Sequence, residues 1–161
     1  MGEGARRKRP VLLVVAALAL TAVVWLAVEQ KPGCPWFHRE ARLPAVSASP
    51  QETVRAYLDA VVKDDKKTAG RITSPAFLHR EGFYPDSPFC NWGKVSDLRF
   101  HTPVQAPARD GYREVVSMHV EFDLNVRETI TMGDGHTFWD FILGRESPAD
   151  RWKIIERVHP M

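Results

Sequence analysis

The sequence predicts an α+β domain in which helices pack on one face of an antiparallel sheet. Helical spacing and capping signals are confined to residues 49–80, and alternating strand patterns with tight turns fill residues 95–158. One uncharged apolar run precedes both regions. Helices followed by a meander of strands are typical of α+β folds, so we expect three helices on a curved antiparallel sheet of about four to six strands.

The apolar run from Val11 to Val28 predicts a transmembrane helix. At 1.5 Å per residue it would extend about 27 Å, close to the roughly 30 Å of a bilayer core. A cleaved signal peptide would need a small-residue cleavage site directly after the run, where Glu29 to Lys31 stand instead. A lipoprotein site is also disfavoured, because Lys31 stands three positions ahead of Cys34, where such a site normally has an apolar residue. We therefore expect a retained, single-pass membrane anchor.

The basic residues 6–9 set the expected orientation, because positive clusters beside a membrane helix tend to remain cytoplasmic. The domain after the anchor is then extracytoplasmic. The net charge of the chain is +2, and residues 1–10 contribute +3, so the remaining residues carry −1. A near-neutral domain with interspersed charges argues against nucleic acid as a partner. The expected segments are a cytoplasmic tail at 1–10, the helix at 11–28, a linker at 29–48 and the domain at 49–161.

The chain contains two cysteines, Cys34 and Cys90. An extracytoplasmic location permits disulfides, and an even number of cysteines favours pairing there. Both lie among prolines and aromatic residues. We expect a Cys34–Cys90 disulfide, with two separate buried thiols as the alternative.

The first helix of the domain has a distinct start signal. Ser49 can cap the free amides, Pro50 suits the first turn, and Glu52 completes a capping box. Asp64 or Asp65 can cap the next helix. The apolar face of the first helix comprises Val54, Tyr57, Leu58 and Val61. Two shorter helices are expected at 66–72 and 76–80, followed by a loop at 81–94.

The strands are predicted from alternation and turns. The strongest pattern places Val116, Met118, Val120, Phe122 and Leu124 on one face. Turns are expected at Gly111, at Gly133 to Gly135 and at 147–150. The expected strands are 95–104, 116–125, 137–143 and 152–158, with Trp152, Ile154 and Val158 sharing a face of the last one.

These features resemble the NTF2-like superfamily, the cone-shaped fold of nuclear transport factor 2, ketosteroid isomerases and SnoaL-type cyclases. The likeness covers about residues 49–159 and rests on SPQETVRAYLDAVVKDD, TAGRITSPAF and TFWDFILGRESPADRWKIIERV. Such a fold hosts enzymes, binding modules and assembly proteins alike. Behind a membrane helix, the arrangement also looks like VirB8-type components of bacterial secretion machinery and Mce-associated membrane proteins, whose domains work through protein contacts.

The resemblance implies a cavity between the first helix and the sheet. A phenol at Tyr57 could donate a hydrogen bond to a substrate oxyanion there, and Asp140 could act as a base if burial raised its pKa. The alternative, which we favour, is that Tyr57 is a core aromatic residue and Asp140 faces solvent. We expect no catalytic residue. The residues proposed to line the cavity are Tyr57, His101, Trp139 and Asp140.

One strand also presents His119, Glu121 and Asp123 at two-residue spacing. These side chains could ligate a metal, but metal sites usually draw ligands from several elements. We therefore expect no metal and no cofactor, and we interpret this face as a contact surface. The sequence thus predicts a non-enzymatic domain that binds a protein partner or a second copy of itself. A small-molecule enzyme or a binder of lipophilic ligands is the alternative.

Overall fold

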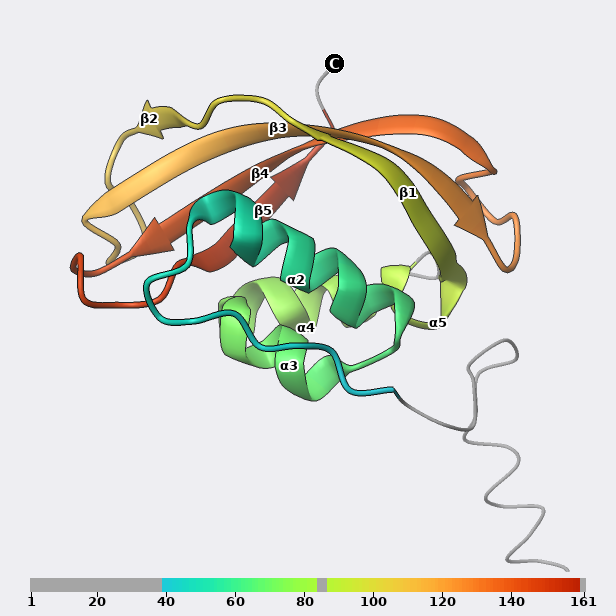
Figure 1. The fold of residues 1–161 in the computed structure, drawn as a ribbon, viewed down its shortest axis with the longest axis horizontal. Helices are drawn as coiled ribbons and strands as arrows, with labels where there is room; N and C mark the ends of the chain where they lie inside the picture. The colour runs from blue at the N-terminus through green and yellow to red at the C-terminus, as the bar shows by residue number, and fades with distance from the viewer. Residues whose placement is uncertain (1–38, 84–86, 160–161) are drawn as a thin grey trace, which may run out of the picture. The chain divides into compact units, whose positions relative to one another are not determined.

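The computed structural model describes residues 39–83 and 87–159, which form an α+β unit with a curved antiparallel sheet. In Figure 1 the sheet arches over the helices, which lie on its concave side. The predicted tail, the apolar run Val11 to Val28 and Cys34 lie outside the described residues. Within the described part of the chain, no helix is long and apolar enough to cross a membrane.

Three helices and one short helical segment cover the concave face. They are α2 (Pro50–Val62), α3 (Lys66–Ile72), α4 (Pro75–Phe83) and α5 (Pro88–Asn91). The predicted capping box at Ser49 is confirmed, since its side chain accepts from the Glu52 amide and Glu52 accepts from the Ser49 amide. Asp65 caps α3. The predicted loop at 81–94 is too long, because α4 continues to Phe83 and a strand already begins at Trp92.

The sheet has five strands, one more than we listed from the sequence. Pro103 has no amide hydrogen, and the predicted strand 95–104 divides close to it. The strands are β1 (Trp92–Phe100), β2 (Val104–Ala106), β3 (Glu114–Val126), β4 (Gly135–Arg145) and β5 (Lys153–Val158). Their order is β1-β3-β4-β5. The short strand β2 also pairs with β3, next to residues that lie closer to the start of β3 than those paired with β1.

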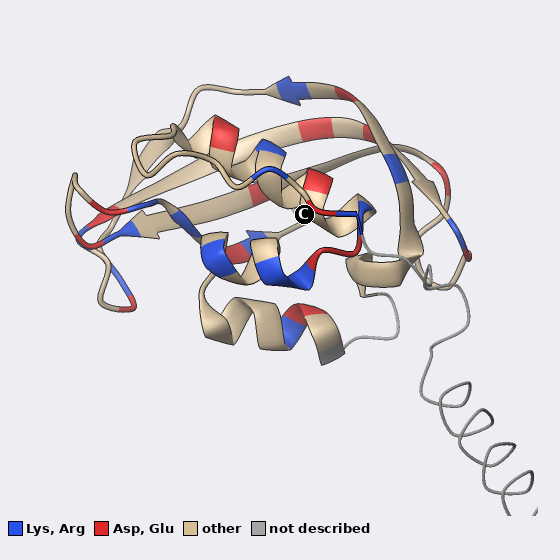
Figure 2. Ribbon diagram, turned by 60° about the horizontal axis from the view of Figure 1, so that its bottom comes forward, with Lys and Arg blue, Asp and Glu red and all other residues tan. Residues whose placement is uncertain are grey.

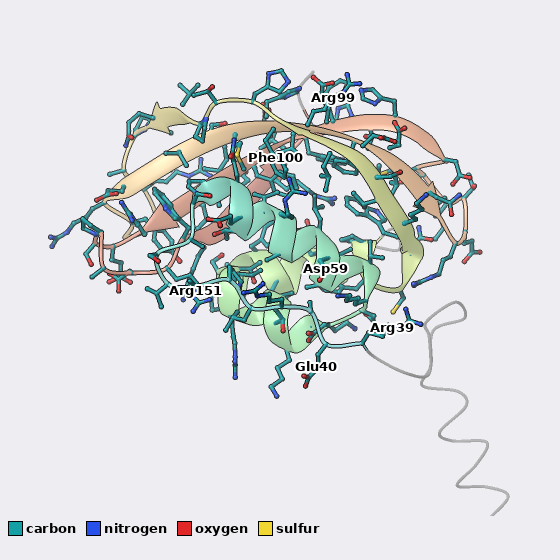
Figure 3. All side chains as sticks on the ribbon, viewed as in Figure 1. Arg39, Glu40, Asp59, Arg99, Phe100 and Arg151 are labelled. Carbon is teal, nitrogen blue, oxygen red and sulfur yellow. The ribbon has the colours of Figure 1, made fainter. Side chains whose placement is uncertain are left out.

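A register shift in β1 changes which residues face outward. Ser96 pairs with Asp123, whereas Arg99 pairs with Glu121, so β1 uses one residue more than β3 between these pairs. Asp97 lies within the shift and adopts a φ of 53°. The extra residue reverses the alternation. Figure 3 accordingly shows Arg99 on the outer side of the sheet and Phe100 on the side of the helices.

A register shift also occurs in β5. Leu143 pairs with Ile154, but the neighbouring Ile142 pairs with Glu156. The extra residue turns Arg157 toward the concave side and leaves Val158 42% exposed. The prediction that Trp152, Ile154 and Val158 share one face was therefore wrong for Val158.

The last part of the predicted linker belongs to the domain. Ala41 is buried, and its amide donates to Oδ2 of Asp65 at 2.8 Å. Arg151 in turn donates to the carbonyl of Pro44. The chain ahead of α2 is therefore held at two points by elements far away in the sequence.

Candidate functional site

The concave interior around Tyr57 is filled by aromatic side chains. Tyr57 is fully buried, and its ring makes edge contacts with Phe77, Phe89 and Phe141 at centroid distances of 5.7, 6.4 and 6.1 Å. Edge-to-face pairs at such distances are favourable packing for aromatic rings. Tyr57 is therefore a core residue, which was the interpretation favoured from the sequence.

A buried polar chain continues from the Tyr57 hydroxyl. This hydroxyl donates to Oε2 of Glu81 at 3.4 Å, and the same oxygen lies 3.0 Å from Nη2 of Arg157. Burial raises the pKa of the Glu81 carboxyl, although Arg157 opposes that shift. The Tyr57 pKa is also raised, first by burial and then by the charge on Glu81. The interior thus contains an ion pair that the sequence analysis missed.

Two tryptophans hold the guanidinium of Arg157. Its Cζ lies 4.0 Å from the centroid of Trp139 and 5.2 Å from that of Trp92, which gives it cation–π contacts. Among the described residues, the Nε and Nη1 atoms of Arg157 and Nε1 of Trp139 are buried without a hydrogen-bond acceptor. A lone arginine in a final strand gives no hint of this role, because its inward direction depends on the register shift in β5.

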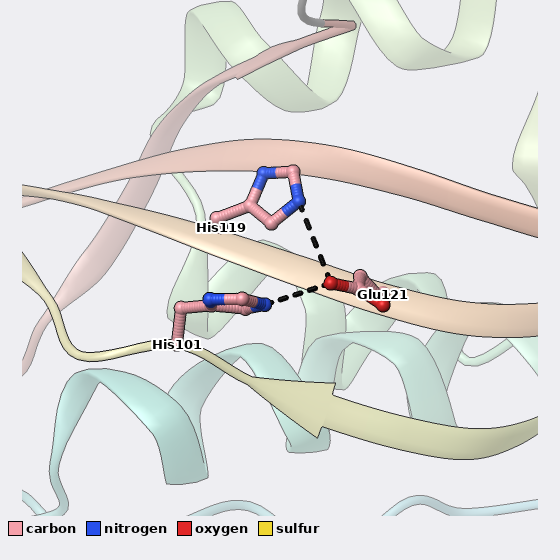
Figure 4. A group of neighbouring side chains, drawn as sticks. All are labelled: His101, His119 and Glu121. Carbon is pink, nitrogen blue, oxygen red and sulfur yellow. Dashed lines mark hydrogen bonds and ion pairs between the residues drawn. The ribbon is translucent and has the colours of Figure 1, made fainter.

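The outer face of the sheet carries the other group of polar side chains. The backbone amide of His101, just after β1, donates to the carbonyl of His119 in β3, and the two rings lie 4.9 Å apart. Nε2 of His101 lies 2.8 Å from Oε1 of Glu121, and Nε2 of His119 lies 4.0 Å from the same oxygen. Figure 4 shows both histidines directed at this carboxylate.

Two further carboxylates orient histidines on this face. Nδ1 of His119 lies 2.7 Å from Oδ1 of Asp140, and Nδ1 of His136 lies 3.1 Å from Oδ1 of Asp123. Nε2 of His136 comes within 3.5 Å of Oε2 of Glu121. The hydrogen bond from His101 is the main cause that lowers the pKa of Glu121, so this carboxyl is ionised at neutral pH.

The four residues proposed to line a cavity do not come together. Tyr57 is in the core and Trp139 packs against it, but His101 and Asp140 lie on the outer face. Strict alternation from Val95 would have turned His101 inward, and the register shift in β1 prevents this. The interface residues His119, Glu121 and Asp123 do lie on one outward face. The structure adds His101, His136 and Asp140 to that face.

A separate groove lies between residues 42–48, α2 and β1. Its volume is about 750 Å³. Leu58, Val95 and Leu98 contribute apolar surface to it, while Arg55 and Asp59 contribute charge. None of the residues proposed from the sequence lines this groove.

Cys90 is disulfide-bonded. Its predicted partner, Cys34, is the only other cysteine in the sequence and lies outside the described residues, so the pairing itself stays a prediction. Cys90 has a φ of 68° at the end of the helical segments, beside the start of β1.

Comparisons with protein-family models, with curated proteins and with solved structures found no match.

Proposed function

We propose that this protein is a membrane-anchored, extracytoplasmic binding domain of the NTF2-like type, and that it contacts a protein through the outer face of its sheet. The observation that carries the proposal is the division of side chains between the two faces. The concave interior is filled by a packed aromatic core, whereas His101, His119 and Glu121 gather on the convex face, which none of the described helices covers.

The composition of the outer face supports a contact role. Val158 is 42% exposed and pairs with Asp140, so apolar surface lies beside the polar cluster. Phe138 packs against His119 with a centroid distance of 5.6 Å. Aromatic residues mixed with hydrogen-bonding groups are typical of protein interfaces. Figure 2 shows acidic and basic residues interspersed over the described elements, which offers no continuous basic stripe for nucleic acid.

The alternative, an enzyme or small-molecule binder with a cavity near Tyr57, has less support. Tyr57 and Phe141 are fully buried, and the proposed partners His101 and Asp140 lie across the sheet from them. An acid–base mechanism needs its groups within hydrogen-bond reach of one substrate atom. Tyr57 and Asp140 do not meet that requirement.

Site-specific photocrosslinking tests the contact surface. A photoreactive residue replaces Arg99, which is exposed on the outer face and pairs with Glu121, and in a control it replaces Arg71, which is exposed on α3. In intact cells we expect crosslinks from position 99 and few from position 71. Mass spectrometry of the products separates a second copy from another protein. Equal crosslinking from both positions, or none from position 99, would overturn the proposal.

Protease accessibility tests the topology. Protease added to intact protoplasts should remove the region after Lys31, because the basic tail is expected inside. Full protection of the domain would reverse the proposed orientation.

A further inference from the structure

The geometry points to a binding site for a divalent transition-metal cation of the zinc type on the outer face of the sheet, with His101, His119 and Glu121 as ligands. One ligand atom from each of these residues lies within 4.8 Å of the other two. This goes beyond the proposed protein contact and departs from the sequence-based expectation of no metal. From the sequence, Asp123 was the third candidate ligand in place of His101. Only the pairing of β1 with β3 brings His101 beside His119.

The ligand atoms are close to the spacing that a metal requires. Zinc binds imidazole nitrogen and carboxylate oxygen at about 2.0–2.2 Å, so ligands in a tetrahedral site lie roughly 3.3 Å apart. Oε1 of Glu121 lies 2.8 Å from Nε2 of His101 and 4.0 Å from Nε2 of His119. Side-chain rotations that move these atoms by about an ångström would bring both distances to this spacing. His101 is 55% exposed and its side chain has room for this movement.

The backbone fixes the positions from which these side chains project. His119 and Glu121 stand two residues apart on one face of β3. The 3.0 Å hydrogen bond from the His101 amide to the His119 carbonyl holds His101 beside them. The ligands therefore come from two adjacent segments, β3 and the residue that follows β1, as metal sites usually require.

The second nitrogen of His119 is already oriented as a metal ligand requires. A histidine that ligates through one nitrogen commonly donates from the other to a carboxylate, and this sets the tautomer and the ring direction. Nδ1 of His119 makes such a contact with Asp140 at 2.7 Å, so its Nε2 carries the free lone pair toward Glu121. This outer carboxylate is the observation that separates the cluster from an ordinary group of surface charges.

Nitrogen ligands determine the class of cation. Imidazole suits zinc, copper and nickel, whereas calcium and magnesium prefer oxygen ligands only. Three protein ligands leave one position of a tetrahedral site open. His136 contacts the second oxygen of this carboxylate, since its Nε2 is 3.5 Å from Oε2 of Glu121.

Metal titration of the purified, tag-free full-length chain tests this inference. After removal of metal with a chelator, zinc binding is measured by calorimetry and cobalt binding by its visible absorption. We expect one equivalent per chain. His101→Asn should weaken binding at least ~100-fold, and Asp140→Ala should weaken it about 10–100-fold because it only orients His119. His79→Asn, on the exposed side of α4, is the matched control and should leave affinity unchanged.

Two results would overturn the site. One is the absence of stoichiometric binding by the wild-type chain. The other is unchanged affinity in His101→Asn. Because the His101 side chain is 55% exposed, a loss of affinity in this variant would not come from misfolding. Thermal unfolding in excess chelator checks that each variant is folded. The titration needs no partner, and the crosslinking pattern needs no added metal, so either proposal can fail while the other stands.

Discussion

Asp140 accepts a hydrogen bond from Nδ1 of His119 across the β3–β4 pair, at 2.7 Å. A carboxylate can only accept, so Nδ1 of the neutral imidazole must carry the proton. We predict that nitrogen NMR of the metal-free wild type at neutral pH shows this tautomer for His119. In Asp140→Ala the proton should shift largely to Nε2. The free energy of unfolding should change by less than about 1 kcal/mol, because the pair is partly exposed. An unchanged tautomer in Asp140→Ala would contradict the assignment.

The buried pair Glu81–Arg157 should show strong coupling. Glu81→Leu leaves the guanidinium buried without its carboxylate, which costs about 3–5 kcal/mol. Arg157→Met leaves Glu81 buried without its cation, although that carboxyl can protonate because its pKa is raised. The double variant removes both groups and should lose at least about 2 kcal/mol less than the sum of the single losses. Urea unfolding of the four proteins measures the cycle.

The chain offers a matched surface control for this cycle. Arg145 pairs with Glu114 at 2.6 Å and stacks on Trp152 at 4.5 Å, but its side chain is 21% exposed and that of Glu114 is 35% exposed. Coupling between Arg145 and Glu114 should stay below about 1 kcal/mol. Equal coupling for the two pairs would show that burial is not the cause.

Asp65 should link stability to pH. Burial favours its neutral form, but hydrogen bonds from the side chain and amide of Thr68 and from the amides of Ala41 and Lys67 outweigh burial and lower its pKa. The stabilisation is thus present above the unfolded-state pKa of about 3.9 and is lost as the pH falls through the lower folded-state pKa. Asp65→Asn should flatten the decline in stability on acidification, as measured by denaturant unfolding at several pH values.

Removal of the whole side chain tests the same residue at neutral pH. Asp65→Ala takes away the cap of α3 and the acceptor for the Ala41 amide. The loss should be about 1–2 kcal/mol. Hydrogen exchange at the Ala41 amide should become faster. A slow Ala41 amide in this variant would mean that other contacts hold the linker.

Gly144 lies in β4 where no side chain fits. A Cβ there would stand 2.6 Å from Cγ of Tyr112. Gly144→Ala should therefore destabilise the fold by about 1–3 kcal/mol through overpacking. Gly133→Ala is the control, since the nearest atom to its Cβ would be 3.9 Å away. Addition of Tyr112→Ala to Gly144→Ala should relieve the clash. Thermal unfolding measures all three variants.

Local rules explain why much of the fold was predictable. The capping box at Ser49 and the cap at Asp65 involve residues three apart, so the sequence contains all the required information. The alternation in β3 likewise predicted that Val116, Met118, Val120, Phe122 and Leu124 face the core, and the structure confirms this. The candidate site was less predictable, because its members depend on register. His101 meets His119 only through the β1–β3 pairing, and Asp140 meets His119 only through the β3–β4 pairing.

The sequence by itself determined the α+β class, the order of the longer helices and strands, and the inward face of β3, because these follow from periodicity and capping within short segments. It also predicted a membrane segment at Val11 to Val28, which lies outside the described residues. Only the tertiary structure decided that Arg157 points inward, that His101 points outward, and that His101, His119 and Glu121 meet. The physical reason is that an extra residue between Ser96 and Arg99 in β1 and another between Ile154 and Glu156 in β5 reverse the alternation. Strand pairing then determines which distant side chains become neighbours.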